Sequence, residues 1–429
     1  MFSGIMTDKE TMRTGAEPAF QVSALAQRGR GLVMEKKTAV PKGYRFATAE
    51  AAIKKPGRKD LALILSDTEA VMAGMFTKNA VKAAPVRLDM ERIKSGKGRA
   101  IVINSGNANA CTGVRGMKDA GEMTRIVAES LGIAEKGVYV CSTGVIGTPM
   151  PMERISPKLP ALAAAAGTAT FDDVASAIMT TDTFPKILST REKIGGKQVT
   201  IAGICKGAGM IAPNMATMLS YIITDAAVDK SALKSALTSA VKTSFNRITI
   251  DGDTSTNDTV FIMANGAAGN APVKTGSPDY AVFAAAVAKL CYELAMLIVK
   301  DGEGATKLVE VIVRNARSEA EAEKAAFAIA NSMLVKTAIY GNDANWGRLI
   351  CATGYSGVAV DDSRVDISLN GLMVCRNGMA TGRDIEANDR LKSKTVTIVI
   401  DLKLGKGSAK VLTCDLTEDY IKINAEYRT

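Results

Sequence analysis

The chain has 429 residues, 47% of them apolar and 23% charged, and its formal net charge is +10. These values exclude a largely disordered chain and leave room for about two or three domains with a sizeable core. The basic residues are scattered, and aromatic residues make up only 5% of the chain. A nucleic-acid-binding surface, which needs clustered cations and stacking aromatics, is therefore not expected.

The amino-acid inventory also restricts the chemistry that the protein can use. The chain has seven cysteines, no C-x-x-C pair and no histidine. An odd number of cysteines in a chain of this size favours reduced, mostly buried thiols and a cytoplasmic protein. Without histidine, Ser-His-Asp and Cys-His catalysis and histidine-ligated zinc are excluded. Any general base must be a carboxylate, a lysine, a tyrosine or a chain-terminal amine.

Residues 1–33 differ from the rest of the chain, because they show no sustained hydrophobic periodicity. They lack the long apolar segment of a secretory signal, and their acidic residues do not suit a transit peptide. We interpret them as a disordered leader or as an upstream start before a natural Met34.

The first half of the chain mixes strands and helices. Apolar runs at 61–66 and 100–106 predict buried strands. Residues 122–131 predict a helix that ends at Gly132. A further strand is expected through Cys141, followed by a Ser-Thr-Gly turn.

Two helices are expected in the middle of the chain. Leu233, Leu237 and Val241 keep helical spacing behind Asp229, a candidate N-cap. Residues 283–299 form the most apolar segment, but Lys289 and Glu293 interrupt it and its apolar positions keep helical spacing. It therefore predicts a core helix and no membrane span.

The C-terminal part is expected to be rich in strands. Residues 308–316 predict a strand, and Ser318 with Glu321 forms a capping box for a helix that reaches the Met333 region. Asn370-Gly371, between two apolar runs, predicts a type I′ hairpin. The runs VTIVIDLKL and AKVLTCDL predict two more strands. The fold class is mixed α/β or α+β, and the strand order does not follow from the sequence.

The stretch GAGMIAPNMATMLSY, residues 207–221, suggests a nucleophile at Thr217. An N-terminal threonine carries its own base, the α-amino group. An internal threonine reaches that state if its hydroxyl attacks the preceding carbonyl, here that of Ala216, and the resulting ester is hydrolysed. This route needs no histidine, and the small residues before Thr217 suit it. The alternative is a loop that enters a buried strand.

Three other segments carry polar groups in suggestive places. STGVIG, residues 142–147, puts a glycine just after a strand end, where backbone N–H groups can converge on an oxyanion. DGEGATK, residues 301–307, puts Glu303 between glycines that allow a ligand to approach closely. On these residues alone, an ordinary turn is the more common explanation of each segment. IDGDTSTND, residues 250–258, lacks the glutamate that ends an EF-hand loop, so we interpret it as a hydrogen-bonded turn. No metal site is expected.

Several long motifs, in this order, resemble one family. They are INSGNANACTG, CSTGVIG, MTTDTFPK, KGAGMIAPNMATML, SFNRITIDGDTSTNDT, DGEGATK, YGNDANWGR and the terminal INAEYRT. Together they resemble the ornithine acetyltransferases, also called glutamate N-acetyltransferases, of arginine biosynthesis, and the resemblance covers residues 34–429. It implies stacked β-sheets flanked by helices, an αββα sandwich like that of N-terminal-nucleophile enzymes, with a smaller β-rich C-terminal part.

The resemblance also implies self-cleavage between Ala216 and Thr217 into an α chain, residues 34–216, and a β chain, residues 217–429. The two chains stay associated and build one active site, and two of each are expected to form a heterotetramer. The family moves an acetyl group from N2-acetyl-L-ornithine to L-glutamate through an acetyl-threonine, and it releases ornithine. No cofactor is implied, and acetyl-CoA is a candidate co-substrate.

Residue roles carry over by matching motifs. Thr217 matches the nucleophile, and Thr143 and Gly144 match the oxyanion-hole pair. The substrate-binding positions fall on Thr183, Lys206, Thr217, Glu303, Asn424 and Thr429, where Thr183 has Thr180 and Thr181 close by in the same motif.

Two other functions stay open at this stage. An N-terminal-nucleophile aminopeptidase or amidase would also cleave itself but would pass the acyl group to water. A non-enzymatic basic binding protein would use the segment around Thr217 as core.

Overall fold

The computed structural model describes residues 38–212 and 218–425. The predicted leader at 1–33, both residues of the predicted cleavage site, Ala216 and Thr217, and the C-terminal Thr429 lie outside the described residues. The strands have these bounds: β1 Tyr44–Ala49, β2 Leu61–Phe76, β3 Lys97–Asn107, β4 Val138–Val145, β5 Lys186–Ile194, β6 Lys197–Lys206, β7 Leu219–Thr224, β8 Thr259–Ala264, β9 Leu308–Ala316, β10 Asp366–Leu369, β11 Leu372–Arg376, β12 Met379–Ala380, β13 Thr395–Asp401 and β14 Gly407–Cys414. The helices have these bounds: α1 Ala84–Arg92, α2 Gly113–Leu131, α3 Met152–Ile155, α4 Leu159–Ala164, α5 Phe171–Ala177, α6 Lys230–Thr243, α7 Pro278–Lys300, α8 Glu319–Ala330, α9 Met333–Tyr340, α10 Trp346–Gly354, α11 Asp384–Leu391 and α12 Glu418–Ala425.

The larger sheet is folded over on itself along strand β2. The N-terminal half of β2 pairs with β1 and β3, and its C-terminal half pairs with β8. The register against β3 shifts between Leu65 and Ala70, where residues 67–69 are exposed. One layer therefore contains β1, β2, β3 and β4, and the other contains β2, β8, β7, β6 and β5.

The apolar layer between the two halves of this sheet is fully enclosed. Alternate residues of each strand face inward, as the period of two in a strand requires. Phe261 of β8 contacts Phe76 of β2 and Tyr139 of β4, with ring centroids 5.6 and 5.1 Å apart. Tyr139, Phe261 and Tyr221 of β7 each have 0% exposure. The inner faces of both layers thus pack directly on each other.

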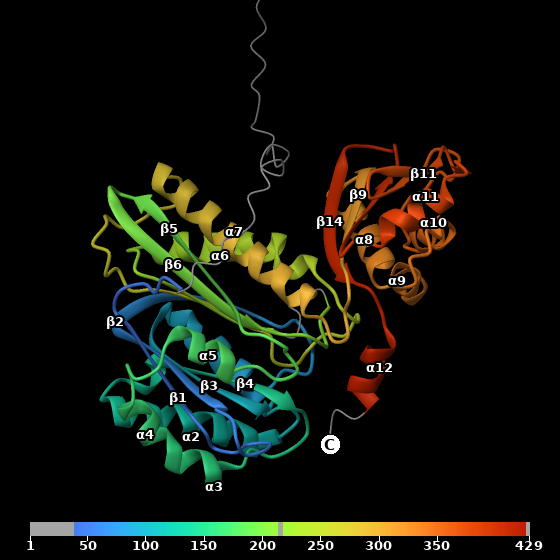
Figure 1. Ribbon diagram of the computed structural model, residues 1–429. Coiled ribbons are helices and arrows are strands. Elements are labelled where there is room, and N and C mark those ends of the chain that lie inside the picture. The colour runs from blue at the N-terminus through green and yellow to red at the C-terminus, as the bar shows by residue number, and fades with distance from the viewer. Residues whose placement is uncertain (1–37, 213–217, 426–429) are drawn as a thin grey trace, which may run out of the picture. The chain divides into compact units, whose positions relative to one another are not determined.

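Helices cover the two outer faces of the folded sheet. Helices α1, α2 and α4 pack on the β1–β4 layer, and α6 and α7 pack on the β5–β8 layer. Figure 1 shows α6 and α7 beside β5 and β6, and α2 and α4 on the opposite side. The result is an αββα sandwich, as the resemblance implies.

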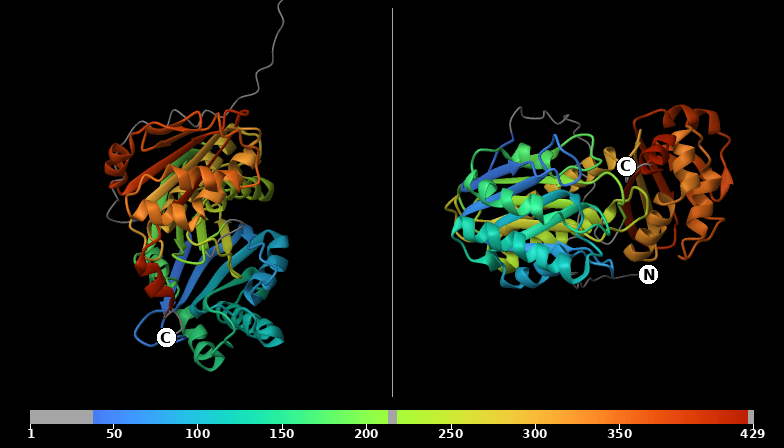
Figure 2. Two further views of the ribbon diagram at one scale, coloured as in Figure 1. Left: turned by 90° about the vertical axis from the view of Figure 1, so that its right-hand side faces the viewer. Right: turned by 90° about the horizontal axis from the view of Figure 1, so that it is seen from below.

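The C-terminal part contains a second sheet with the strand order β12-β11-β10-β13-β9-β14. The apolar residues of one face pack on helices α8, α9, α10 and α11, which gather on one side of these strands in the turned views of Figure 2. Leu412 and Cys414 of β14 instead join the core that α7 forms with the larger sheet. The C-terminal part is β-rich as predicted, but its core depends equally on these helices.

Several predicted elements are confirmed, most of them with longer bounds. The strand predicted at 308–316 is β9, and the Asn370-Gly371 turn joins β10 to β11 with φ of +44° and +77°, as a type I′ turn requires. Gly132 ends α2 in the left-handed conformation, but α2 begins nine residues before the predicted start, at Gly113. Of the seven cysteines, five are buried and none forms a disulfide.

Three local predictions are wrong. The predicted Ser-Thr-Gly turn is the end of β4, because Ser142–Gly144 pairs with the end of β3. The helix after Ser318 ends at Ala330, and Ser332 caps a separate helix, α9, by accepting from the Val335 N–H. Asp229 occupies the N-cap position of α6 but its side chain makes no capping hydrogen bond.

Helix α7 has the length and hydropathy of a membrane span, with a mean hydropathy of 2.0 over its most apolar window, half of which is buried. No other described helix has both properties. The buried face of α7, which includes Phe283, Leu290 and Leu294, packs on the larger sheet and α6. This matches the core helix predicted at 283–299.

Because Phe261 fills the space between the two layers, Phe261→Ala should lower the free energy of unfolding by about 3–5 kcal/mol. Urea titration followed by circular dichroism measures this loss. Met379→Ala is the control, since that side chain is 70% exposed and its removal should change stability by less than about 0.5 kcal/mol. A loss of under about 1 kcal/mol for Phe261→Ala would contradict an enclosed layer at this position.

Candidate active site

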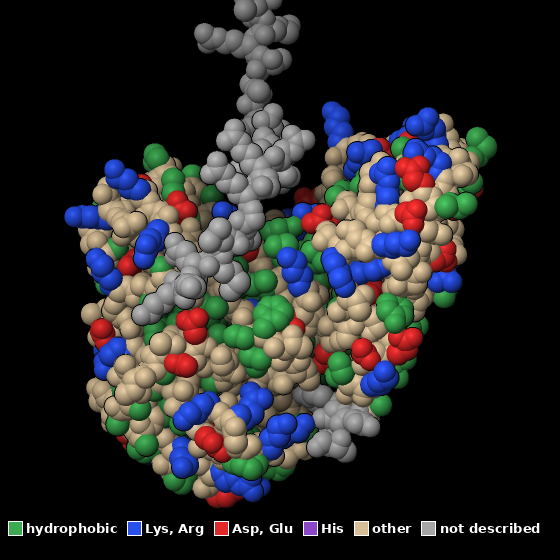
Figure 3. All heavy atoms as spheres, in the orientation of Figure 1, with side chains coloured by type: hydrophobic (Ala, Val, Ile, Leu, Met, Phe, Trp, Pro, Cys, Tyr) green, Lys and Arg blue, Asp and Glu red, His purple; other side chains and the backbone are tan. Residues whose placement is uncertain are grey.

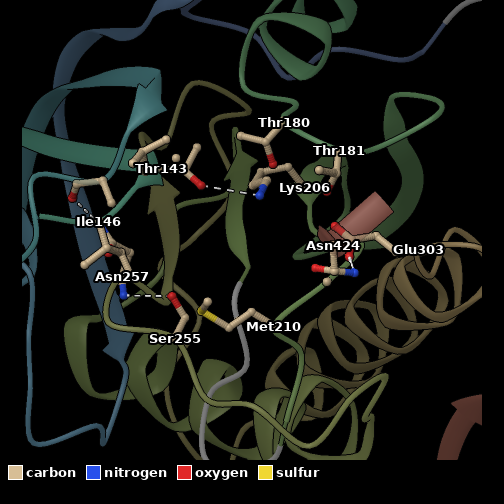
Figure 4. A pocket seen from close by; sticks show the side chains of 14 residues that line it. Thr143, Ile146, Thr180, Thr181, Lys206, Met210, Ser255, Asn257, Glu303 and Asn424 are labelled. Carbon is tan, nitrogen blue, oxygen red and sulfur yellow. Dashed lines mark hydrogen bonds between the residues drawn. The ribbon is translucent and has the colours of Figure 1, made fainter. Parts of the chain in front are cut away.

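A pocket of about 250 Å³ lies at one end of the sandwich, where the ends of strands from the two sheet layers come together (Figure 4). Its walls come from the ends of β4 and β6, from loops that precede β8 and follow α7, and from α12. The lining residues are Ala108, Thr143, Gly144, Val145, Ile146, Thr180, Thr181, Lys206, Gly209, Met210, Ser255, Asn257, Glu303 and Asn424. Five predicted site residues, Thr143, Gly144, Lys206, Glu303 and Asn424, therefore lie together.

Thr143 and Gly144 sit on a strand end with unusual backbone geometry. Thr143 pairs with Ser105 and Gly144 with Gly106, and the register then shifts at Asn107. Gly144 has φ of +136°, and a Cβ atom there would lie 2.2 Å from the carbonyl carbon of Gly106. Only glycine fits such a close approach. The geometry thus explains why a glycine follows Thr143.

Lys206 is the buried cation of the pocket. Its side chain is at the end of β6, 3% exposed, and Nζ donates to Oγ1 of Thr143 at 3.3 Å (Figure 4). Burial lowers the pKa of Lys206, and the negative charge of Asp182 opposes that shift. Among the described residues no carboxylate lies within ion-pair distance of Lys206 Nζ.

A second buried lysine, Lys186, lies behind the pocket wall and is fully paired. Its Nζ donates to Asp182 at 2.7 Å and to Asp301 at 2.5 Å. Asp182 also accepts from the N–H of Gly207 at 2.6 Å. Although burial raises the pKa of Asp182, the charges of Lys206 and Lys186 lower it to about 2. This ion network fixes the backbone that follows Lys206.

Glu303 and Asn424 meet on the opposite side of the pocket. Glu303 is 8% exposed, and its Oε2 accepts from Asn424 Nδ2 at 2.8 Å. The Glu303 N–H donates to the Ala208 carbonyl at 2.9 Å. A Cβ atom at Gly209 would lie 2.4 Å from Glu303 Oε2, so the glycine makes room for this carboxylate. The predicted loop around Glu303 thus contains a buried pocket residue.

The predicted substrate residue Thr183 does not line the pocket. Its Oγ1 donates to Asp301, and its N–H donates to the same carboxylate at 3.1 Å. Thr180 and Thr181, the alternatives in the same motif, line the pocket instead. Thr217 and Thr429 lie outside the described residues.

Sequence reasoning did not identify Ser255 and Asn257 as pocket residues. The segment that contains them is the hydrogen-bonded turn predicted there, since the Asn257 N–H donates to Ser255 Oγ at 3.1 Å. It also lines the pocket. The available signal was a run of five polar residues, 254–258, directly before an apolar strand. No cluster of three or more potential metal ligands occurs in the described part of the chain.

One carboxylate outside the lining, that of Asp251, supports the pocket wall. It accepts from the N–H of Met210 at 2.5 Å and of Ile211 at 2.9 Å, and Met210 has φ of +57°. Tyr420 of α12 donates to the same carboxylate at 3.5 Å. Asp251 therefore joins the Met210 wall to the helix that carries Asn424.

The fold and the pocket define an αββα sandwich protein with a polar site at one end of its stacked sheets. The family model described as the ArgJ family matches residues 45–429. The arginine biosynthesis bifunctional protein ArgJ of Geobacter sulfurreducens is 58% identical over 390 residues, which cover 90% of this chain and 99% of that protein. The chain belongs to the ArgJ family of bifunctional arginine-biosynthesis proteins, as the sequence motifs predicted.

Two solved structures are also similar. ArgJ of Bacillus halodurans is 48% identical, with a TM-score of 0.48 over 49% of this chain and 99% of that one. The ornithine acetyltransferase of Mycobacterium tuberculosis, solved with ornithine, is 34% identical, with a TM-score of 0.36 over 41% of this chain and 93% of that one.

The buried Asp251 carboxyl group should make the free energy of unfolding depend on pH. Burial, opposed by N–H donors that include that of Met210, raises the pKa of Asp251 to about 6. Between about pH 4 and pH 6 the folded chain binds this proton and the unfolded chain does not, so the contribution of Asp251 to stability falls as pH rises and is constant above that window. The measurement is the melting temperature of wild type and of Asp251→Asn from pH 4 to 7. The melting temperature of wild type minus that of the variant should fall as pH rises to about 6 and then stay constant. A difference that is flat over this range would contradict the assignment.

Proposed function

We propose that the chain transfers an acetyl group from N2-acetyl-L-ornithine to L-glutamate through an ester on Thr217. It is an acyltransferase of arginine biosynthesis by family membership. The observation that carries the proposal is one pocket that combines the Thr143–Gly144 strand end, a carboxylate, and a lysine that has no ion-pair partner among the described residues. This set provides oxyanion donors and a binding group for each charge of an amino-acid substrate.

Self-cleavage between Ala216 and Thr217 would provide the nucleophile and its base. The freed Thr217 amine takes the hydroxyl proton as oxygen attacks the acetyl carbonyl, and it returns the proton to the ornithine amine that leaves. Glutamate then attacks the acetyl ester with its own amine, the bond between the acetyl carbon and the Thr217 oxygen breaks, and the Thr217 amine moves the proton from the glutamate nitrogen to that oxygen. The chain has no histidine to do this work.

Thr143 and Gly144 would stabilise the tetrahedral oxyanion. The Thr143 hydroxyl and the Gly144 N–H supply two donors, and Lys206 next to Thr143 adds a positive field. Losing one such donor typically costs about 3 kcal/mol of barrier, on the order of a hundredfold in rate.

The remaining pocket groups would bind the substrates. Lys206 would take the substrate carboxylate, because its ammonium faces the pocket with a hydroxyl as its only partner among the described residues. Glu303 would hold an ammonium group, with Asn424 beside it. Thr180 and Thr181 are better placed than Thr183 to contact substrate. The C-terminal Thr429 keeps its proposed binding role from the family resemblance.

Two further features belong to the proposal without a structural argument. They are acetyl-CoA as a second acetyl donor and an assembly of two α and two β chains. An assay with acetyl-CoA and glutamate alone tests the first feature. Figure 3 shows lysine and arginine interspersed with aspartate and glutamate over the face that it presents.

Self-cleavage predicts that purified wild-type protein runs as two fragments on a denaturing gel. Edman sequencing of the C-terminal fragment should read Thr-Met-Leu-Ser. Thr217→Ala should stay uncut and inactive, because it lacks both the nucleophile and the new amine. An active wild-type enzyme that remains one unbroken chain would refute the mechanism.

The same preparation separates the transferase from an amidase, since both would cleave themselves. Release of ornithine from acetylornithine should rise strongly when glutamate is added, and acetylglutamate should form in equal amount. Acetate release that ignores glutamate would favour the amidase.

The ammonium-binding role predicts a split between kinetic constants for Glu303→Gln. This change keeps the volume and one acceptor oxygen but removes the charge, so KM for acetylornithine should rise on the order of tenfold while processing continues. Steady-state kinetics with each substrate measures the effect. Unchanged constants for both substrates would exclude this role for Glu303.

A further inference from the structure

Asn257 ties together two segments that bracket the proposed oxyanion hole. Its Nδ2 donates to the Ser142 carbonyl at 2.8 Å and to the Ala108 carbonyl at 2.6 Å. Ser142 directly precedes Thr143 on β4, and the Asn257 side chain is 6% exposed. With both amide hydrogens in use, Asn257 holds the strand that carries Thr143 and Gly144.

The next residue, Asp258, holds the chain on the other side of the pocket. Its Oδ1 accepts from the N–H of Met218 at 3.0 Å, which is the amide directly after Thr217. Its own carbonyl accepts from the N–H of Thr77 at 3.0 Å, at the end of β2. The side chain has 0% exposure, and Oδ2 has no hydrogen-bond partner among the described residues.

A buried carboxyl oxygen without a partner is uncommon in native proteins and calls for an explanation. Burial raises the pKa of Asp258 well above its usual range, although the Met218 N–H and the Lys206 charge oppose this. Burial therefore favours the neutral acid over the carboxylate at this position. A neutral acid avoids the cost of an unpaired buried charge and still accepts from Met218 through Oδ1.

We propose that Asn257 and Asp258 are positioning residues that together set the separation between the Thr143–Gly144 strand and the chain that follows Thr217. The two residues are joined by one planar peptide bond, which keeps their Cα atoms about 3.8 Å apart. This short link limits how far the strand held by Asn257 and the amide held by Asp258 can separate. Reactions of this kind lose on the order of a hundredfold in rate when reacting groups are misplaced by about 1 Å. The inference rests on the proposed function, since it assumes that Thr217 is the reacting residue.

The role of Asp258 predicts a contrast between two variants of the full chain. Asp258→Ala removes the acceptor for the Met218 N–H and should slow self-cleavage by about 10- to 100-fold. Asp258→Asn keeps an acceptor oxygen and, like the protonated acid, carries a donor on the other arm, so it should cleave at nearly the wild-type rate. The measurement follows freshly purified precursor over time by gel and intact mass.

Asp225→Ala is the matched control. Asp225 is 2% exposed and accepts from the N–H groups of Thr200 and Lys42 at 2.8 and 3.1 Å. It directly follows the end of β7 that lies away from the junction, so the six residues of that strand separate it from Met218. Asp225→Ala should lower the melting temperature without changing the cleavage rate, so a general loss of stability cannot imitate the expected result.

The outcomes separate the inference from the proposed function. If wild type never cleaves between Ala216 and Thr217, the proposed function fails. If wild type cleaves and Asp258→Ala cleaves as fast, the positioning role fails. Equal slowing in Asp258→Asn and Asp258→Ala would also overturn it, because the acceptor oxygen that Asn keeps for the Met218 N–H would then make no difference.

Asn257 gives an independent test if Asp258→Ala does not fold. Asn257→Ala removes both donors, so kcat for acetyl transfer should fall at least about tenfold while KM for acetylornithine stays near the wild-type value. A change confined to KM would mean that Asn257 only contacts substrate, and unchanged kinetics would overturn its positioning role.

Discussion

The apolar layer between the two halves of the folded sheet is the constraint on which the site depends. Pocket residues come from both halves: Thr143 from one layer, and Lys206 from the other. Their 3.3 Å contact depends on the buried packing of the inner faces around Tyr139 and Phe261. Close-packed interiors deform little, so the dense layer fixes the distance between strands that no loop connects locally.

The site contains charged side chains at buried positions, where the loss of hydration destabilises a charge. Lys186 is stabilised by two carboxylates, but Lys206 has only a hydroxyl as its partner in the described part of the chain. A buried cation without a counter-ion is unfavourable unless a ligand supplies one. The difference between these two lysines, twenty residues apart on adjacent strands, distinguishes a structural ion network from a binding group.

The sequence determines most elements wherever local chemistry and tertiary packing agree. The strand at 308–316 has an apolar run that its sheet buries, and the Asn370-Gly371 turn needs the positive φ that these residues tolerate. Residues 142–144 show the opposite case, because their turn-forming side chains are overridden by pairing with β3, a partner that is distant in sequence. The break between α8 and α9 was missed because Asn331-Ser332 is short and its flanks are helix-forming.

The site residues also fall into those that the sequence predicts and those that only the fold reveals. The motifs identified Thr143, Gly144, Lys206, Glu303 and Asn424, which the fold gathers in one pocket. A motif with three threonines within four residues cannot say which of them faces inward, and here Thr183 turns to Asp301. The sequence does not predict the role of Asn257, because its hydrogen bond to the Ser142 carbonyl forms only when the fold brings these distant segments together.

The arrangement of Glu303 and Asn424 bears on how one pocket could serve two substrates. Ornithine and glutamate share an α-amino acid group but carry side chains of opposite charge. A carboxylate alone would bind the ornithine ammonium and repel the glutamate carboxylate. The Asn424 amide donates its two N–H groups to Glu303 at 2.8 Å and to the Tyr420 carbonyl at 3.0 Å, and its own carbonyl oxygen is left as an acceptor for a cation. The Glu303–Asn424 pair is thus suited to the cationic side chain of the donor, and an anionic acceptor would have to displace one of the two Asn424 hydrogen bonds or bind elsewhere in the pocket.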